Sequence, residues 1–181
     1  MTAPLLFTPI TLGRINVPNR IVISPMCQYS AIDGNVNEWH HAHLGSLALS
    51  GAGLLYIEAT AVSPEGRITP GCVGLYSEDN FHALKKLVDY LRAVSPIKLA
   101  IQLGHAGRKA SSRRPWEGGE LMTPNEGGWP TFAPSAIPHK EGELTPDELS
   151  KQQIADLLKS FEVSARRARE LGLDVIEVHA A

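Results

Sequence analysis

Four short apolar runs alternate with segments of helical periodicity along this chain of 181 residues. The runs have the length of β-strands and lie at residues 20–24, 54–59, 98–103 and 173–179. Nearly continuous apolar runs are typical of parallel strands covered on both faces, and strands that alternate with helices are joined by right-handed crossovers. The alternation therefore predicts an α/β fold with a parallel sheet, either an open doubly wound sheet or a (βα)8 barrel.

Capping signals mark three helices between these runs. One helix is predicted over residues 38–50, and a second begins after Ser77, whose hydroxyl is a typical N-cap. A third begins after Ser150, because Gln153 completes a capping box with it. Gly172 is the natural stop of this last helix.

Two segments lie outside the alternation, and the whole chain, residues 1–181, is expected to form one domain. Residues 1–19 contain extended pieces at 6–10 and 14–17, which predict a hairpin lid. The strands and helices then occupy residues 20–181. Within them, residues 104–149 form a long polar stretch rich in Gly, Pro and Trp. Because loops of this length are usually functional or mobile, we expect this one on the active-site side.

Composition excludes several classes of function. The net charge is −2, which gives no reason to expect a nucleic-acid partner. The arginine groups Arg113–Arg114 and 166–169 are interpreted as solvated surface. Cys27 and Cys72 lack C-x-x-C spacing, so neither a zinc site nor a disulfide framework is indicated, and a reducing, cytoplasmic setting fits. No apolar stretch reaches the roughly 20 residues that span a bilayer, so no membrane partner is expected.

Polar side chains recur where the predicted strands end. Pro25 stops the first run, because proline cannot donate a ladder hydrogen bond. Polar residues lie at or just beyond the carboxyl end of each run: Cys27 and Tyr29, Glu58 and Thr60, Gln102 and His105, Glu177 and His179. Their convergence on one face is what the active site of a barrel needs, and the absence of Gly-x-Gly-x-x-Gly after the first run argues against a dinucleotide-binding sheet.

Each of these residues also has a purely structural interpretation. Cys27 could be a buried cysteine at a strand end, and His179 could be a core histidine with satisfied hydrogen bonds. Glu58 and Glu177 lie in apolar runs and would need partners if buried, so structural roles are favoured for both. The histidines at 40, 41 and 43 invite a metal site, but packing and capping at a helix start is the more common role.

The motifs together resemble the old yellow enzyme family, in the same order along nearly the whole chain. The Cys-x-Tyr after Pro-Met points to the thermophilic-like bacterial branch of flavin-dependent ene-reductases. The segments that carry the resemblance are Asn19–Tyr29, Glu58–Ala61, Gly66–Thr69, Gln102–Ala110, Ala133–Ala136 and Val175–Ala181.

This resemblance implies a (βα)8 barrel that holds FMN, is reduced by NADPH or NADH, and reduces α,β-unsaturated carbonyl compounds. It places Tyr29 and His179 on the substrate, with His179 donating a hydrogen bond to the carbonyl oxygen, and sets Cys27 beside the reactive nitrogen of the flavin. Gln102 would bind the pyrimidine edge of the ring, because an amide side chain offers both a donor and an acceptor. The cofactor-binding residues by resemblance are Ser24, Pro25, Met26, Cys27, Ala59 and Gln102, with no metal expected.

Only the first four strands of such a barrel are present in this sequence. The second member of the carbonyl-binding pair, the tyrosine that follows it and the phosphate site would lie further on. We therefore expect the N-terminal half of an FMN-binding barrel, completed by a complementary C-terminal half or by a homo-oligomer. Two alternatives remain open, a non-catalytic half-barrel that acts as a scaffold and a metal-dependent hydrolase that uses the histidine cluster.

Overall fold

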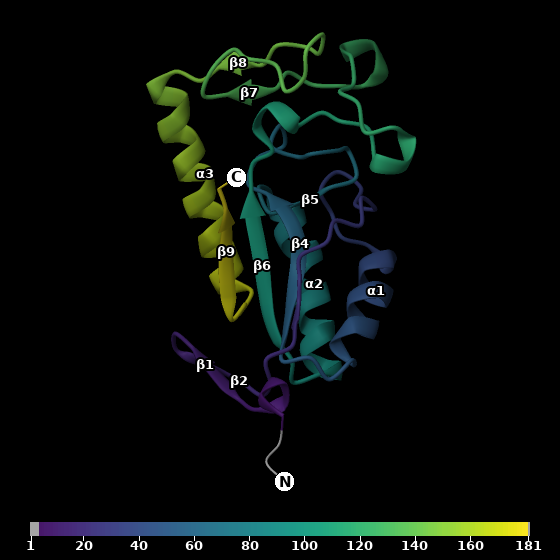
Figure 1. Ribbon diagram of the computed structural model, residues 1–181, viewed down its shortest axis with the longest axis vertical. Coiled ribbons are helices and arrows are strands. Elements are labelled where there is room, and N and C mark those ends of the chain that lie inside the picture. Colours follow the sequence, from purple (N-terminus) through teal and green to yellow (C-terminus); the bar gives the residue numbers. More distant parts are fainter. Residues whose placement is uncertain (1–3, 181) are drawn as a thin grey trace.

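A computed structural model describes residues 4–180 and is built on one parallel sheet. Its main strands follow each other in chain order, all parallel (Figure 1). A short additional strand pairs with the end of the second one. The strands in spatial order are β3 (Val22–Ile23), β4 (Leu54–Ala61), β6 (Lys98–Gly104) and β9 (Val175–His179), with β5 (Val73–Gly74) beside β4. The predicted α/β fold with a parallel sheet is confirmed.

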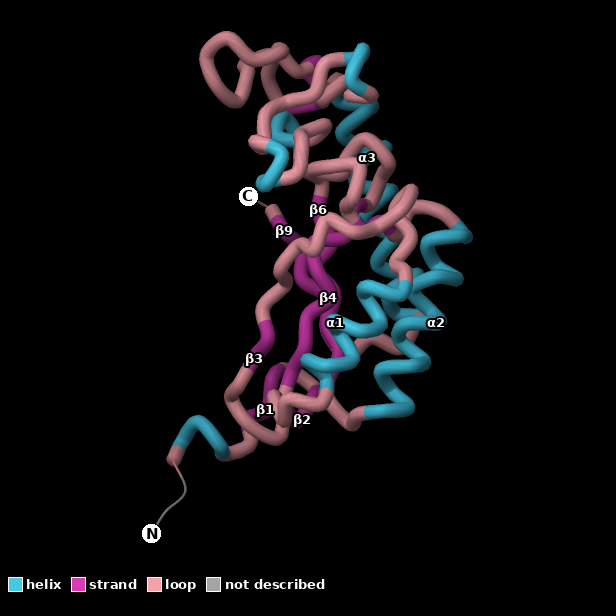
Figure 2. The backbone as a smooth tube through the Cα atoms, turned by 90° about the vertical axis from the view of Figure 1, so that its right-hand side faces the viewer, coloured by secondary structure: helices cyan, strands magenta, loops and turns pink. Residues whose placement is uncertain are grey.

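The three long helices cover only one face of this sheet (Figure 2). They are α1 (Glu38–Ala48), α2 (Glu78–Val94) and α3 (Lys151–Glu170). Helices on a single face and strands in sequential order are features of a barrel, whereas a doubly wound sheet carries helices on both faces. The structure is therefore part of a (βα)8 barrel rather than a doubly wound sheet, two folds that the periodicity of the sequence did not distinguish.

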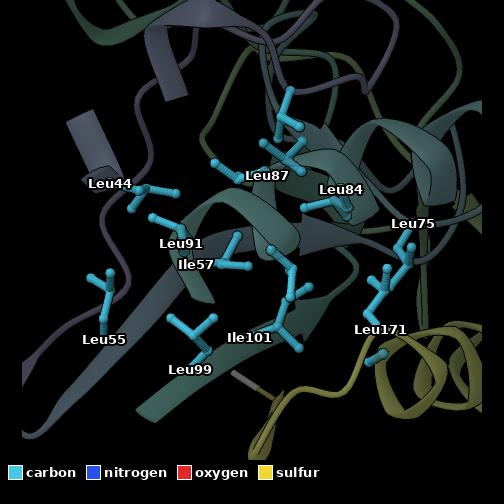
Figure 3. Packing of buried hydrophobic residues seen from close by; sticks show 14 of the residues in the cluster. Leu44, Leu55, Ile57, Leu75, Leu84, Leu87, Leu91, Leu99, Ile101 and Leu171 are labelled. Carbon is cyan, nitrogen blue, oxygen red and sulfur yellow. The ribbon is translucent and has the colours of Figure 1, made fainter. Parts of the chain in front are cut away.

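The main core lies between the sheet and these helices (Figure 3). Leu55 and Ile57 of β4 and Ile101 of β6 are fully buried there. Leu84 and Leu87 of α2 pack against them from the helix side. The caps form as predicted: Ser77 Oγ accepts a hydrogen bond from the Asn80 amide, and Ser150 and Gln153 form a capping box.

The N-terminal hairpin packs on the opposite, concave face of the sheet. It consists of β1 (Ile10–Leu12) and β2 (Ile15–Val17), at the end where the strands begin (Figure 1). Val17 forms a second apolar cluster with Leu54 and Ala100. The hairpin therefore closes the lower end of the concave face, away from the carboxyl ends of the strands. The predicted extended piece at residues 6–10 is wrong in its first part, because Leu5–Phe7 is a 3-10 turn.

The first apolar run is shorter and more exposed than predicted. Only Val22–Ile23 of residues 20–24 form a strand, and the side chain of Val22 is 49% exposed. Val22 pairs with Leu54 and faces the concave side, whereas Ile23 pairs with Leu55 and faces the helices. The run was expected to form a buried strand, and the structure covers it on one face only.

The long segment 104–149 lies over the carboxyl ends of the strands (Figure 1). It is not structureless. It contains three 3-10 turns and a short pair of parallel strands, none of which the sequence predicted. The turns are Gly107–Lys109, Pro115–Glu117 and Pro124–Glu126, and the strands are β7 (Phe132–Ala133) and β8 (Asp147–Glu148).

Asp174 ties the last strand to the sheet at its lower end. Its Oδ2 accepts hydrogen bonds from the Leu99 amide at 2.9 Å and from Arg92 at 2.6 Å, and Lys98 Nζ lies 3.5 Å from Oδ1. Burial alone would raise the pKa of this carboxyl, but the Leu99 amide and the Arg92 and Lys98 charges together lower it below its ordinary value. The ionised carboxylate therefore stabilises the folded chain.

We expect Asp174→Asn to lower the free energy of unfolding at neutral pH by roughly 1.5 to 3 kcal/mol, the usual range for a hydrogen bond to a charged group. Because the folded pKa is lowered, this contribution is present above the unfolded pKa and is lost as the pH falls through the folded one. Urea unfolding at several pH values should therefore show a smaller loss of stability in acid for the variant than for the parent. Asp89→Asn, which breaks the exposed pair with Lys85, is the control and should change stability by less than about 0.5 kcal/mol.

Candidate active site

The carboxyl ends of the strands share one hollow on the concave face of the sheet. Ala59 pairs with Gln102, Gln102 pairs with Glu177, and Gly104 pairs with His179. Partners in a parallel sheet point to the same face and alternate residues repeat it, so all five residues lie on the concave side. Gln102 Nε2 donates a hydrogen bond to Glu177 Oε1 at 2.7 Å, which gives that carboxylate a partner.

The pocket in this hollow has an apolar floor and a polar rim. Small residues of β4 and β6 form the floor, namely Ala59, Ala61 and Gly104. His179, Arg67 and Lys109 line the rim. Such a floor leaves space for a flat group to lie against the strand backbones, with charged and hydrogen-bonding side chains around its edge.

The segment that follows β3 is held in an unusual backbone conformation. Tyr29 has φ of 52°, in the left-handed region that side chains other than glycine rarely adopt. Its carbonyl oxygen accepts a hydrogen bond from Arg114 Nε at 2.9 Å, and the Ala31 amide donates to the Gly71 carbonyl at 2.9 Å. A Cβ on Gly71 would lie only 2.2 Å from Tyr29 O, so glycine is required for this close approach. Strain of this kind persists only where the surroundings enforce it.

Cys27 and Cys72 are neighbours in the fold, although they lie far apart in the sequence. Both are free thiols, and Cys72 Sγ accepts a hydrogen bond from the Thr69 amide at 3.3 Å. The hydrogen bond to Cys72 and then burial raise the pKa of the Cys27 thiol, and the same hydrogen bond lowers the pKa of Cys72. Cys27 is thus a neutral S–H donor, which suits a neighbour of a ligand better than a covalent nucleophile.

Tyr29 stands at the outer side of the same site. Burial, followed by the nearby Cys27, Cys72 and Glu58, raises the pKa of its phenol to about 12. Its ring packs edge to face against Trp116, with ring centroids 5.8 Å apart. Tyr29 lines a second hollow beneath the segment 104–149, and Lys109 borders both hollows. The phenol is therefore a neutral hydrogen-bond donor next to the main pocket rather than in its wall.

The three histidines of α1 diverge instead of meeting. His40 is fully buried and faces Glu58, His41 Nδ1 lies 3.0 Å from the Asn37 carbonyl, and His43 stacks on Trp39. Among residues 4–180, no three His, Cys, Asp or Glu side chains are grouped so that they could hold a metal ion. The metal-dependent hydrolase alternative receives no support from this arrangement.

Sequence reasoning missed several residues that shape the site. Arg114 was interpreted as solvated surface, but it holds the backbone of Tyr29. Arg167 likewise donates to the Leu75 carbonyl at 3.2 Å. No local pattern marks Cys72 as the neighbour of Cys27, because their contact depends on how β5 packs beside β4.

Within the described residues, no helix is long and apolar enough to cross a membrane.

Known proteins match the chain over nearly its full length. A family model described as NADH:flavin oxidoreductase / NADH oxidase matches residues 5–181. An NADH:flavin oxidoreductase of Gibberella zeae is 45% identical over 97% of this chain and 43% of its own length, and an NADPH dehydrogenase of Bacillus velezensis is 41% identical over 97% and 48%. The solved structure of a morphinone reductase matches with a TM-score of 0.83 and 29% identity, over 99% of this chain and 49% of its own. The chain therefore spans about half the length of these relatives.

We expect Gly71→Ala to displace the Tyr29 segment, because the new methyl group would overlap the Tyr29 carbonyl. Overpacking of this kind typically costs about 1 to 3 kcal/mol in the free energy of unfolding, which urea denaturation measures. Pro70→Ala changes the adjacent exposed residue and adds no atom near Tyr29, so it should cost less than about 1 kcal/mol. Equal losses in the two variants would contradict the required close approach.

Proposed function

Because the chain belongs to the NADH:flavin oxidoreductase / NADH oxidase family, we propose that it forms the N-terminal half of an FMN-dependent enzyme that uses NAD(P)H to reduce the activated C=C bonds of α,β-unsaturated carbonyl compounds. The observation that carries the proposal is the shared concave face of Ala59, Gln102 and His179, with Cys27 beside it. The motif resemblance to the old yellow enzyme family agrees with this membership, and a solved old yellow enzyme from Pichia also has the same fold at a TM-score of 0.82.

The residues of the pocket fit a flavin ring. The floor of Ala59, Ala61 and Gly104 offers a shallow apolar surface for a planar group. Gln102 stands beside that floor and has both a donor and an acceptor for the pyrimidine edge. The exposed face of the segment from Ser24 to Cys27 would border the ring. The phosphate site of such barrels follows strands seven and eight, which are not part of this chain.

Bound FMN would supply the hydride chemistry, and the side chains of this chain would orient the substrate. His179 would donate a hydrogen bond to the substrate carbonyl oxygen, which draws electron density away from the β-carbon. Tyr29 would contact the substrate as a neutral phenol, consistent with its raised pKa. Cys27 would present an uncharged, polarisable thiol to the flavin, because its hydrogen bond to Cys72 and its burial raise its pKa.

We propose that additional strands complete the barrel. β3 and β9 are the edges of the sheet, and four parallel strands cannot close into a barrel. Val22 on the concave side is 49% exposed, and Val178 on the face that the helices cover elsewhere is 60% exposed. Such apolar edges invite pairing with further polypeptide. A complementary C-terminal half would cover both faces and supply the phosphate site, whereas a second copy of this chain would cover them without that site.

The decisive experiment compares the chain alone with the chain co-expressed with the C-terminal half of the Bacillus velezensis relative. We expect weak flavin absorbance for the chain alone. The purified complex should bind FMN, be reduced by NADPH or NADH and be reoxidised by an enone such as cyclohexenone. A colourless, inactive complex would favour the non-catalytic scaffold instead. Tight FMN binding and turnover by the monomeric chain alone would refute the dependence on a second half.

In that complex, we expect His179→Ala to retain the flavin absorbance but to slow reoxidation by the enone about 100- to 1000-fold, the usual effect of removing one donor to a developing oxyanion. Stopped-flow absorbance of the flavin measures this step directly. His82→Ala is the matched control, because His82 is an exposed histidine of α2, away from the pocket and from the open edges of the sheet. A similar loss in both variants would contradict the role of His179.

A further inference from the structure

Glu58 is a buried carboxylate beneath the segment that carries Cys27 and Tyr29. It is only 3% exposed, and it is the extra residue of a bulge in β4, between Ile57 and Ala59. Bulges turn a side chain out of the regular alternation and are common next to active sites. This bulge leaves Ile57 in the core and Ala59 in the pocket, and Glu58 reaches toward the loop after β3.

One hydrogen bond holds the carboxylate in place, and a histidine ring faces it. The Gln28 amide donates a hydrogen bond to Glu58 Oε2 at 3.0 Å, and His40 Nε2 lies 3.5 Å from Oε1. The Asn37 amide lies at hydrogen-bond distance from His40 Nδ1, 3.1 Å away, which leaves Nε2 on the side of the carboxylate. Among the described residues His40 Nε2 makes no hydrogen bond, so the ring faces the carboxylate across 3.5 Å without binding it. A buried carboxylate is costly unless it is hydrogen-bonded, as Glu58 is to the Gln28 amide.

The charge of Glu58 acts on the three acidic groups around it. It helps to raise the pKa of Cys27, after the Cys72 hydrogen bond and burial, and that of Tyr29, after burial. At Cys72 the same charge opposes the hydrogen bond from Cys27, which lowers that pKa. A positive group, Arg114, binds the Tyr29 carbonyl from the long loop. A negative charge next to an ionisable thiol or phenol disfavours its anion, because two like charges in a poorly solvated site repel each other.

We propose that Glu58 is a positioning residue: its carboxylate, bound by the Gln28 amide and facing the His40 ring, fixes the strained turn that presents Cys27 and Tyr29 and places a negative charge beneath both. Its contribution to catalysis rests on the proposed function. The position of the turn and the effect of the Glu58 charge on Cys27 do not depend on the proposed function. Both can be measured on the chain without flavin or enone.

The test follows the alkylation of Cys27 by iodoacetamide as a function of pH, with mass spectrometry to separate Cys27 from Cys72. Glu58→Gln removes the charge at nearly constant shape. At about pH 8.5, near the ordinary thiol pKa, we expect roughly threefold faster alkylation of Cys27, because a larger thiolate fraction outweighs its lower nucleophilicity. Glu58→Asp keeps the charge and should retain the pH profile of the parent.

Glu177→Gln is the matched control, a carboxylate of the same sheet that does not act on Cys27. The proposal would be overturned if Glu58→Gln left the pH dependence of Cys27 alkylation unchanged. It would also be overturned if Glu58→Asp or Glu177→Gln changed that pH dependence as much as Glu58→Gln does. Circular dichroism checks the folding of each variant. If Glu58→Gln does not fold, hydrogen exchange of the Gln28 amide in the parent chain decides: a protected amide supports the proposal, and free exchange overturns it. Failure of flavin binding in the complex would contradict the proposed function and leave these outcomes unaffected.

Discussion

The pairing of β4 with β6 is the contact on which the rest of the structure depends. In its register, Leu55 lies beside Leu99 and Ile57 beside Ile101, so both pairs are buried beneath the helices. The same register sets Ala59 beside Gln102 on the concave face. A slip of one residue would turn the apolar set toward the hollow and the polar set into the core. The burial of the core therefore fixes the position of the site.

The bulge at Glu58 is the one break in this pairing, and it links the sheet to the loop after β3. In a regular strand, successive side chains of β4 would point alternately to the concave face and to the helices. The extra residue frees a carboxylate to bind the Gln28 amide and to face His40. The strained turn at Tyr29 is held from the other side by Arg114 and by the close approach of Gly71. Polar contacts from three parts of the chain thus hold a conformation that local preference disfavours.

The concave face is packed with apolar side chains at one end and carries the pocket at the other, and this arrangement agrees with the family assignment. The hairpin fills the lower end with apolar side chains such as Val17. The upper end keeps small residues and a polar rim under the long segment 104–149. Its open edges at β3 and β9 are consistent with a chain that spans about half the length of its relatives.

The sequence by itself determined the strands, the helices and the end of the sheet where the polar residues gather, because apolar periodicity and caps such as Ser77 and Ser150 are local signals. The motifs also predicted the family. Only the tertiary structure decided that the helices cover one face, that the first strand is short, and that Cys72 and Arg114 belong to the site. These features depend on which distant segments pack together, and no local pattern encodes the contact of Cys27 with Cys72 or the bulge that aims Glu58.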